Sequence, residues 1–78
     1  MSNEGYNGWE NWETWNTYNW LSSSQGAYEA ATECARFGYE HLRCFIADFV
    51  RELNGAHNED IAIRLVDIDE LRTALLEE

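Results

Sequence analysis

The residues of this chain with the clearest chemical potential are its carboxylates. The 78 residues include 15 aspartates and glutamates against five arginines and no lysine, which gives a formal net charge of −10 at pH 7. This charge disfavours direct binding to nucleic-acid phosphate or anionic lipid, because both kinds of binding need clustered cations. It steers the protein toward positively charged partners instead. The composition therefore favours a protein partner with a basic, nucleic-acid-binding surface.

Eight acidic side chains are the candidate partner-binding residues. They are Glu29, Glu33, Glu40, Glu59, Asp60, Asp67, Asp69 and Glu70. Duplex DNA carries one charge per about 1.7 Å of its axis, counting both strands, so a row of carboxylates coarsely imitates it. An acidic face that only keeps a small protein soluble has the same sequence pattern. Both interpretations stay open on the sequence alone.

The cysteines and histidines lack the spacing of a metal site. Cys34, His41 and Cys44 lie near one another, but zinc sites usually contain close pairs such as C-x₂-C. We predict that Cys34 and Cys44 are small core residues with reduced thiols, and that the protein holds no metal. No G-x-S-x-G, phosphate-binding loop or H-E-x-x-H motif is present. We therefore expect no catalytic residue, no cofactor and no enzymatic activity.

All four tryptophans lie between residues 9 and 20. Platforms that stack single-stranded nucleic acid combine aromatic residues with cations, whereas the neighbours here are acidic or neutral. We expect Trp15, Tyr18 and Trp20 to be core residues of a buried first helix. The remaining aromatic residues of this region are candidate contacts, since Trp and Tyr dominate binding hot spots. These candidate contacts are Tyr6, Trp9 and Trp12.

The spacing of apolar residues predicts an all-α fold. We expect a single acidic domain over residues 1–78, with an N-terminal arm over residues 1–10 and four to five short helices around the Trp-rich first one. Asn54 and Gly55 are typical of a helix stop. The predicted helices cover residues 12–22, 25–37, 39–54 and 68–76.

Residues 56–66 permit two interpretations. The run Ile61-Ala62-Ile63-Arg64-Leu65-Val66 is rich in β-branched residues, as in a short strand. Asn58 followed by two acids instead favours the start of a short helix. We prefer the helix, because no second strand is available to pair with a strand here.

The sequence also bears on the cellular location. No apolar run approaches the about 20 residues of a membrane span, and the polar N-terminus lacks the basic start of a secretory signal. We expect a monomer in the cytoplasm of a bacterial host.

The stretch Tyr6-Asn7-Gly8-Trp9-Glu10-Asn11-Trp12-Glu13-Thr14-Trp15-Asn16 resembles an N-terminal motif of short proteins carried by phages and mobile elements. The likeness reaches Leu21 and implies no reaction. The size and acidity are similar to those of anti-CRISPR proteins, including inhibitors of type I Cascade complexes. That resemblance implies stoichiometric binding to the basic surface of Cascade that receives target DNA. The alternative function is an acidic helical accessory or scaffold protein of phage that acts by protein–protein association.

Overall fold

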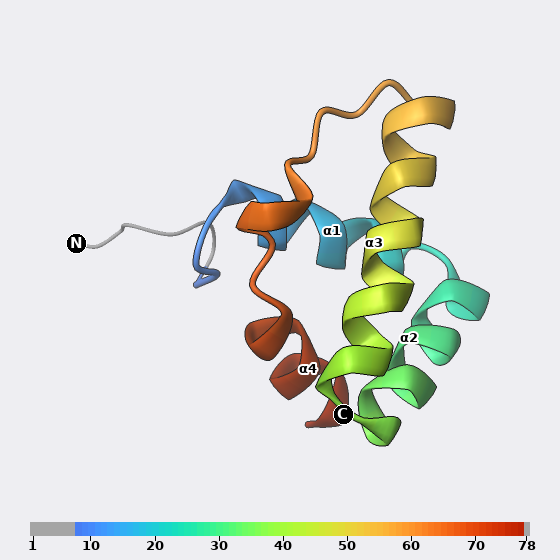
Figure 1. Ribbon diagram of the computed structural model, residues 1–78, viewed down its shortest axis with the longest axis vertical. Helices are drawn as coiled ribbons and strands as arrows, with labels where there is room; N and C mark the ends of the chain where they lie inside the picture. Colours follow the sequence, from blue (N-terminus) through green and yellow to red (C-terminus); the bar gives the residue numbers. More distant parts are fainter. Residues whose placement is uncertain (1–7, 78) are drawn as a thin grey trace.

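The computed structural model describes residues 8–77, which form four α-helices and one short 3₁₀ helix (Figure 1). The described residues contain no strand, so the predicted all-α fold class is confirmed. In Figure 1, α4 is drawn to the left of α3 and α2 to its right, and the two also pack against each other. The elements are α1 (Trp12–Ser22), α2 (Gln25–Phe37), α3 (Tyr39–Ala56), η1 (Ile63–Leu65) and α4 (Ile68–Leu76).

Polar side chains fix where three of the helices begin. Asn11, Ser24 and Asp67 each accept a hydrogen bond from the backbone N–H three residues further along the chain. Each bond satisfies one of the amide groups that a helix leaves unpaired in its first turn. The predicted limits of α1, α2 and α4 are confirmed. None of the helices between residues 8 and 77 is both long and apolar enough to cross a membrane.

The end of α3 differs from the prediction. The helix continues through Gly55 and ends at Ala56, two residues beyond the expected stop. The Asn54 side chain donates to the Ile61 carbonyl at 3.0 Å and accepts from the Ile61 N–H at 2.9 Å. Asn54 therefore bridges the following loop instead of ending the helix. The positive φ of this turn, 58°, belongs to Asn58, a residue type that adopts this conformation more readily than most.

Residues 57–66 form a loop with one 3₁₀ turn, so the predicted helix over this segment was wrong in its extent. Asn58 does not begin a helix, and only Ile63–Leu65 is helical. The segment needs no partner strand, because Asn54 already pairs with both backbone groups of Ile61. Ile61 and Val66 are buried and attach the loop to the core.

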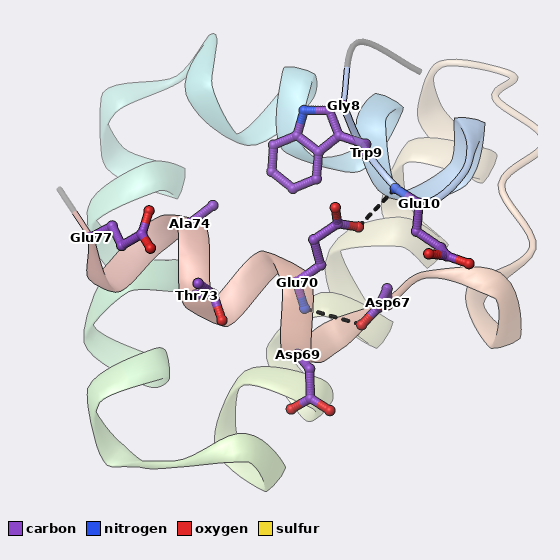
Figure 2. Close-up of a pocket in the computed structure, with 9 residues that line it drawn as sticks. All are labelled: Gly8, Trp9, Glu10, Asp67, Asp69, Glu70, Thr73, Ala74 and Glu77. Carbon is purple, nitrogen blue, oxygen red and sulfur yellow. Dashed lines mark hydrogen bonds between the residues drawn. The ribbon is translucent and has the colours of Figure 1, made fainter. Parts of the chain in front are cut away.

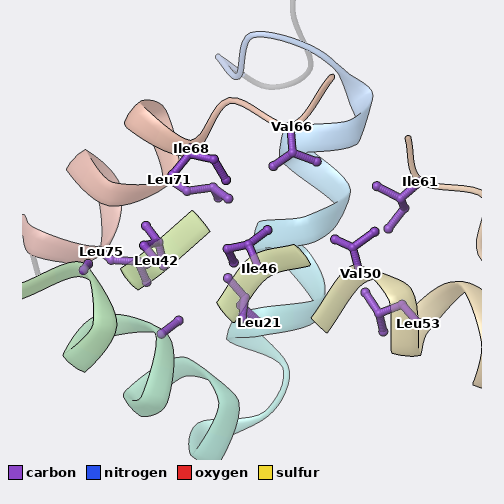
Figure 3. Close-up of a cluster of buried hydrophobic side chains, with 12 residues drawn as sticks. Leu21, Leu42, Ile46, Val50, Leu53, Ile61, Val66, Ile68, Leu71 and Leu75 are labelled. Carbon is purple, nitrogen blue, oxygen red and sulfur yellow. The ribbon is translucent and has the colours of Figure 1, made fainter. Parts of the chain in front are cut away.

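The core is made by aliphatic side chains from all four helices and this loop (Figure 3). α2 and α4 each pack against the other three helices. α3 contributes Leu42, Ile46, Val50 and Leu53, which recur at three- and four-residue spacing along one side of the helix. The buried hydrophobic residues are Leu21, Ala31, Ala35, Leu42, Ile46, Val50, Leu53, Ile61, Val66, Ile68, Leu71 and Leu75.

The buried face of α1 is mostly polar, which contradicts the prediction for its aromatic residues. Trp15, Tyr18 and Trp20 are only half-buried, and of these Tyr18 and Trp20 pack against the core. The buried positions of α1 are Thr14, Asn16, Thr17 and Leu21.

This burial is possible because the polar groups of α1 are paired. The Thr17 hydroxyl donates to the Glu13 carbonyl at 2.8 Å, and the Asn16 side chain donates to Glu59 at 2.9 Å. A paired polar group is buried at little net cost. Small side chains fit this face, whereas the larger Trp12 and Trp20 side chains pack half-buried against the core.

The cysteines are free thiols. Cys34 is half-buried and packs against the core, but Cys44 is exposed on α3, so the prediction that Cys44 is a core residue was wrong. Leu42 and Ile46 form the buried side of α3 here, and Cys44 lies outside that side. The prediction relied on the residue type of Cys44 and not on its position along the helix.

Candidate protein-binding surface

The N-terminal turn of α1 is attached to the segment that precedes α4. The Asn11 side-chain amide donates to the Leu65 carbonyl at 2.7 Å. The Thr14 hydroxyl donates to the Asn11 side-chain oxygen at 2.7 Å and accepts from the Asp67 N–H at 2.8 Å. Thr14 is fully buried. These polar residues of the Trp-rich stretch therefore join the beginning of the described chain to its end.

Trp9 is held above α4 by contacts on two sides. Its ring packs on Tyr18 with a centroid distance of 4.8 Å. The next residue, Glu10, donates its backbone N–H to a Glu70 carboxylate oxygen at 2.9 Å. Figure 2 shows Glu70 pointing from α4 toward this N–H, beside the indole. The half-buried indole is therefore placed with little freedom.

An open hollow of about 590 Å³ lies between Trp9 and the outer side of α4 (Figure 2). We call this surface the Trp9 face. Five of its nine residues are carboxylates and none is a cation. The lining residues are Gly8, Trp9, Glu10, Asp67, Asp69, Glu70, Thr73, Ala74 and Glu77.

The five carboxylates of the Trp9 face differ in what they already bind. Asp67 accepts from the Glu70 N–H at 3.0 Å, and Glu70 accepts from the Glu10 N–H. The exposed side chains of Glu10, Asp69 and Glu77 make no hydrogen bond or ion pair with any residue between 8 and 77. These three are therefore available to cationic groups of a partner.

The sequence-predicted acids of α2 and α3 lie elsewhere and have local partners. Glu33 pairs with Arg36 at 3.8 Å, and Glu40 pairs with Arg43 at 2.7 Å. The Arg43 guanidinium donates hydrogen bonds to Glu40, which lowers the pKa of this carboxyl and raises the pKa of Arg43. Glu29 accepts from the Gln25 side chain at 3.0 Å. Glu29 and Glu33 line a separate shallow hollow on α2.

The structure thus brings three of the eight sequence-predicted acids together, namely Asp67, Asp69 and Glu70. Glu59 is half-buried against Asn16, and Asp60 is exposed in the same loop. Of the predicted aromatic contacts, Trp9 lines the hollow, Trp12 packs half-buried against the core, and Tyr6 lies outside the described residues.

Two acids of the Trp9 face were absent from the sequence-based set. Glu77 lies on the same side of α4 as Glu70, Thr73 and Ala74. Their three- and four-residue spacing in the sequence was the signal that could have placed Glu77 beside Glu70. Glu10 had no such signal, because its proximity to α4 arises from a contact between residues 60 positions apart.

Between residues 8 and 77, no group of three or more His, Cys, Asp or Glu side chains is arranged to hold a metal ion. The Trp9 face instead combines an aromatic surface with negative charge, an arrangement that attracts the cationic side chains of a protein.

No curated protein and no solved structure matches the chain. One family model, described as a family of unknown function, matches residues 2–77. The chain therefore belongs to the DUF7249 family.

Proposed function

We propose that this protein is a stoichiometric inhibitor that binds a basic, nucleic-acid-binding surface of another protein through the Trp9 face. The observation that supports this proposal most is the lining of that face, with one tryptophan, five carboxylates and no cation. A CRISPR–Cas effector complex of the Cascade type is the proposed partner, on the resemblance to anti-CRISPR proteins. The inhibitor acts as a cytoplasmic monomer and blocks target-DNA binding without catalysis.

The binding energy and the association rate have different sources in this proposal. A partner arginine or lysine placed over the Trp9 indole contributes about 0.5–2 kcal/mol. Each exposed ion pair with Glu10, Asp69 or Glu77 contributes only about 0.2–1 kcal/mol. The net charge of −10 mainly accelerates encounter with a basic surface. Trp9 is therefore the anchor, and the acids provide steering and orientation.

Competition with DNA follows from the shared chemistry of the two ligands. A surface that receives phosphates presents clustered arginine and lysine residues, and the same cations pair with the carboxylates of the Trp9 face. Both complexes release counterions, so both weaken as salt rises. We expect the affinity of the protein for its partner to be highest at low ionic strength.

Charge reversal on the Trp9 face tests the proposal. Glu10 and Glu77 lie toward opposite ends of the hollow in Figure 2, and neither side chain has a hydrogen-bond partner among residues 8–77. We expect E10K/E77K to weaken inhibition of target-DNA binding by a Cascade complex at least about tenfold, since several charge pairs are lost together. The measurement is a DNA-binding titration of the complex at a fixed salt concentration.

A matched control separates the site from the overall charge. The E29K/E33K variant changes the net charge by the same amount, but on the α2 hollow away from the Trp9 face. We expect this control to lose much less inhibition than E10K/E77K. Equal losses in the two variants would mean that the overall charge, and not the Trp9 face, causes inhibition. Unchanged inhibition by E10K/E77K would rule out the Trp9 face as the binding site.

The exposure of Phe37 favours a second candidate function, that of an acidic accessory or scaffold protein that associates with itself. Phe37 at the end of α2 is 70% exposed, and the neighbouring Tyr39 is 42% exposed. Large exposed aromatic residues commonly anchor interfaces. Sedimentation velocity over a range of concentrations tests this alternative. An oligomer that F37S dissociates would support it, whereas a monomer at every concentration would oppose it.

A further inference from the structure

A second depression lies between α3 and the loop that leads to α4, away from the Trp9 face. One hollow of about 240 Å³ includes Tyr39, Arg43 and Arg64, and a neighbouring hollow of about 220 Å³ includes Arg51. Ala47 and Ile63 line both hollows, so the two are adjacent along α3. We call this depression the arginine groove.

The arginine groove has a charge character opposite to that of the Trp9 face. Three of the five arginines in the chain line it, whereas none lines the Trp9 face. Arg43 and Arg51 each have an exposed acid three residues earlier, Glu40 and Asp48. Such exposed pairs are weak, so an incoming carboxylate can displace them at small cost.

Arg64 differs from the other arginines. It is exposed, and it makes no hydrogen bond or ion pair with any residue between 8 and 77. Its neighbours Ile63 and Leu65 are 40% and 45% exposed. Arg64 and the exposed aliphatic side chain of Ile63 line the same hollow and together offer charge and apolar area to a partner.

We propose that the arginine groove is a second docking surface, and that its occupant is an acidic protein segment carrying aliphatic side chains. The aliphatic groups lie on the floor formed by Ala47 and Ile63, and the carboxylates face Arg43, Arg51 and Arg64. Arginine suits this role, because its planar guanidinium pairs with a carboxylate through two parallel hydrogen bonds. The apolar floor favours a protein segment over a nucleic-acid backbone, whose phosphates gain nothing from aliphatic contacts.

This proposal does not rest on the proposed function, because the two surfaces share no lining residue. The groove follows α3 from Tyr39 to Asn54, a length of about 22 Å at about 1.5 Å per residue. A partner helix of about four turns spans that distance. The occupant is therefore a short amphipathic segment.

A synthetic amphipathic peptide of leucine and glutamate, about four helical turns long, is the probe for the experiment. Its titration into the full-length, ¹⁵N-labelled protein should move the amide signals of Ala47, Ile63 and Arg64 in a saturable manner. A peptide of the same length with lysine in place of glutamate should not bind the groove. Neither should a peptide with serine in place of leucine.

The R64E variant should weaken the peptide affinity about tenfold, the loss expected when a charge-assisted hydrogen bond is replaced by repulsion. R36E is the matched control, because it changes the net charge equally at an exposed arginine on α2. It should weaken the affinity less than about threefold. I63S, which alters a partly exposed side chain, tests the apolar floor and should also weaken binding. Circular dichroism confirms the fold of each variant.

Four results would overturn this assignment. They are absence of saturable binding up to about 1 mM peptide, signal changes confined to the Trp9 face, equal losses in R64E and R36E, and self-association of the protein that R64E abolishes. The last result would assign the groove to a second copy of the chain. The E10K/E77K variant should still bind the peptide, so failure of the groove and failure of the Trp9 face are distinguishable.

Discussion

The Trp9 face and the arginine groove are built in different ways, although α4 or the loop before it contributes to both. The Trp9 face depends on hydrogen bonds between residues more than 50 positions apart, such as Thr14 with Asp67 and Glu10 with Glu70. The arginine groove follows the regular helix α3 and a loop held by Asn54 and Ile61, seven positions apart. The acidic surface therefore depends on hydrogen bonds between the two ends of the described chain, and the cationic one on α3 and a loop that Asn54 attaches to it.

This difference also separates the charges of the molecule. Three carboxylates of α2 and α3 are partly neutralised by arginines three residues away, namely Glu33, Glu40 and Asp48. The acids around Trp9 have no arginine among the lining residues. A chain with a net charge of −10 thus gathers five carboxylates without a cation on one face and three arginines in a groove on another. Substitutions that affect one region and spare the other test this separation.

Removal of the Thr14 hydroxyl should have the largest effect, because it breaks two buried contacts behind the Trp9 face. In T14V the shape is retained, but the Asp67 N–H loses its partner. We expect the free energy of unfolding to fall by about 2–3 kcal/mol, as measured by urea denaturation. T32V is the control, since the Thr32 hydroxyl donates only to the Tyr28 carbonyl one helical turn away. A loss in T14V no larger than that in T32V would contradict the structural role of Thr14.

The N11A substitution should have the next largest effect. It removes the N-cap of α1 and the hydrogen bond to the Leu65 carbonyl. A loss of about 1–2 kcal/mol in the free energy of unfolding is expected from thermal or urea melts. N19A, at an exposed position of the same helix, should cost much less. Amide signals near Trp9 should shift in N11A while those of Ala47 stay in place, and shifts of similar size at both would mean that the regions are coupled.

Substitution of Glu70 should separate charge from hydrogen bonding on the Trp9 face. E70A removes the acceptor of the Glu10 N–H and should cost about 0.5–1.5 kcal/mol. E70Q keeps a side-chain oxygen at the same position and should retain most of the stability while losing one negative charge. Urea denaturation of the two variants provides the comparison. Equal losses would show that the carboxylate charge, and not the hydrogen bond, holds the segment around Trp9.

Helix limits were predictable where a side chain caps the helix within a few residues. Asn11, Ser24 and Asp67 are local signals, and the helices that they begin were predicted correctly. The end of α3 was not predictable in this way, because Asn54 bonds to Ile61 across the loop. The buried residues of α1 were also missed, since the apolar pattern does not reveal that Thr14 finds polar partners in the interior.

The candidate site was predictable only in part for the same reason. Asp67, Asp69 and Glu70 are close in sequence, and Trp9 was singled out by its type. The hydrogen bond between Glu10 and Glu70 holds Trp9 beside these acids, and residue spacing in the sequence does not predict a contact across 60 positions. The arginine groove was not recognised because its cations look like ordinary helix-surface residues. Only the fold shows that Arg64 and Arg43 line the same hollow.

Of these substitutions, E40Q should change the stability of the protein least. Its effect should be confined to the end of α3 beside the arginine groove. Arg43 donates two hydrogen bonds to one Glu40 oxygen, at 3.1 and 2.7 Å, and these lower the pKa of Glu40 from 4.5. A carboxyl whose pKa is lower in the folded state stabilises the fold above its unfolded pKa. This contribution disappears as the pH falls through the folded pKa.

The melting temperature of E40Q should therefore lie slightly below that of the wild type at neutral pH, and the difference should shrink below about pH 4. E52Q is the control, because Glu52 is exposed on the same helix and forms no ion pair with residues 8–77. E40Q should also bind the acidic peptide more tightly, since Arg43 loses its competing carboxylate, while inhibition through the Trp9 face stays unchanged. A melting difference that persists unchanged in acid would mean that packing of the Glu40 side chain, and not its charge, supports this end of α3.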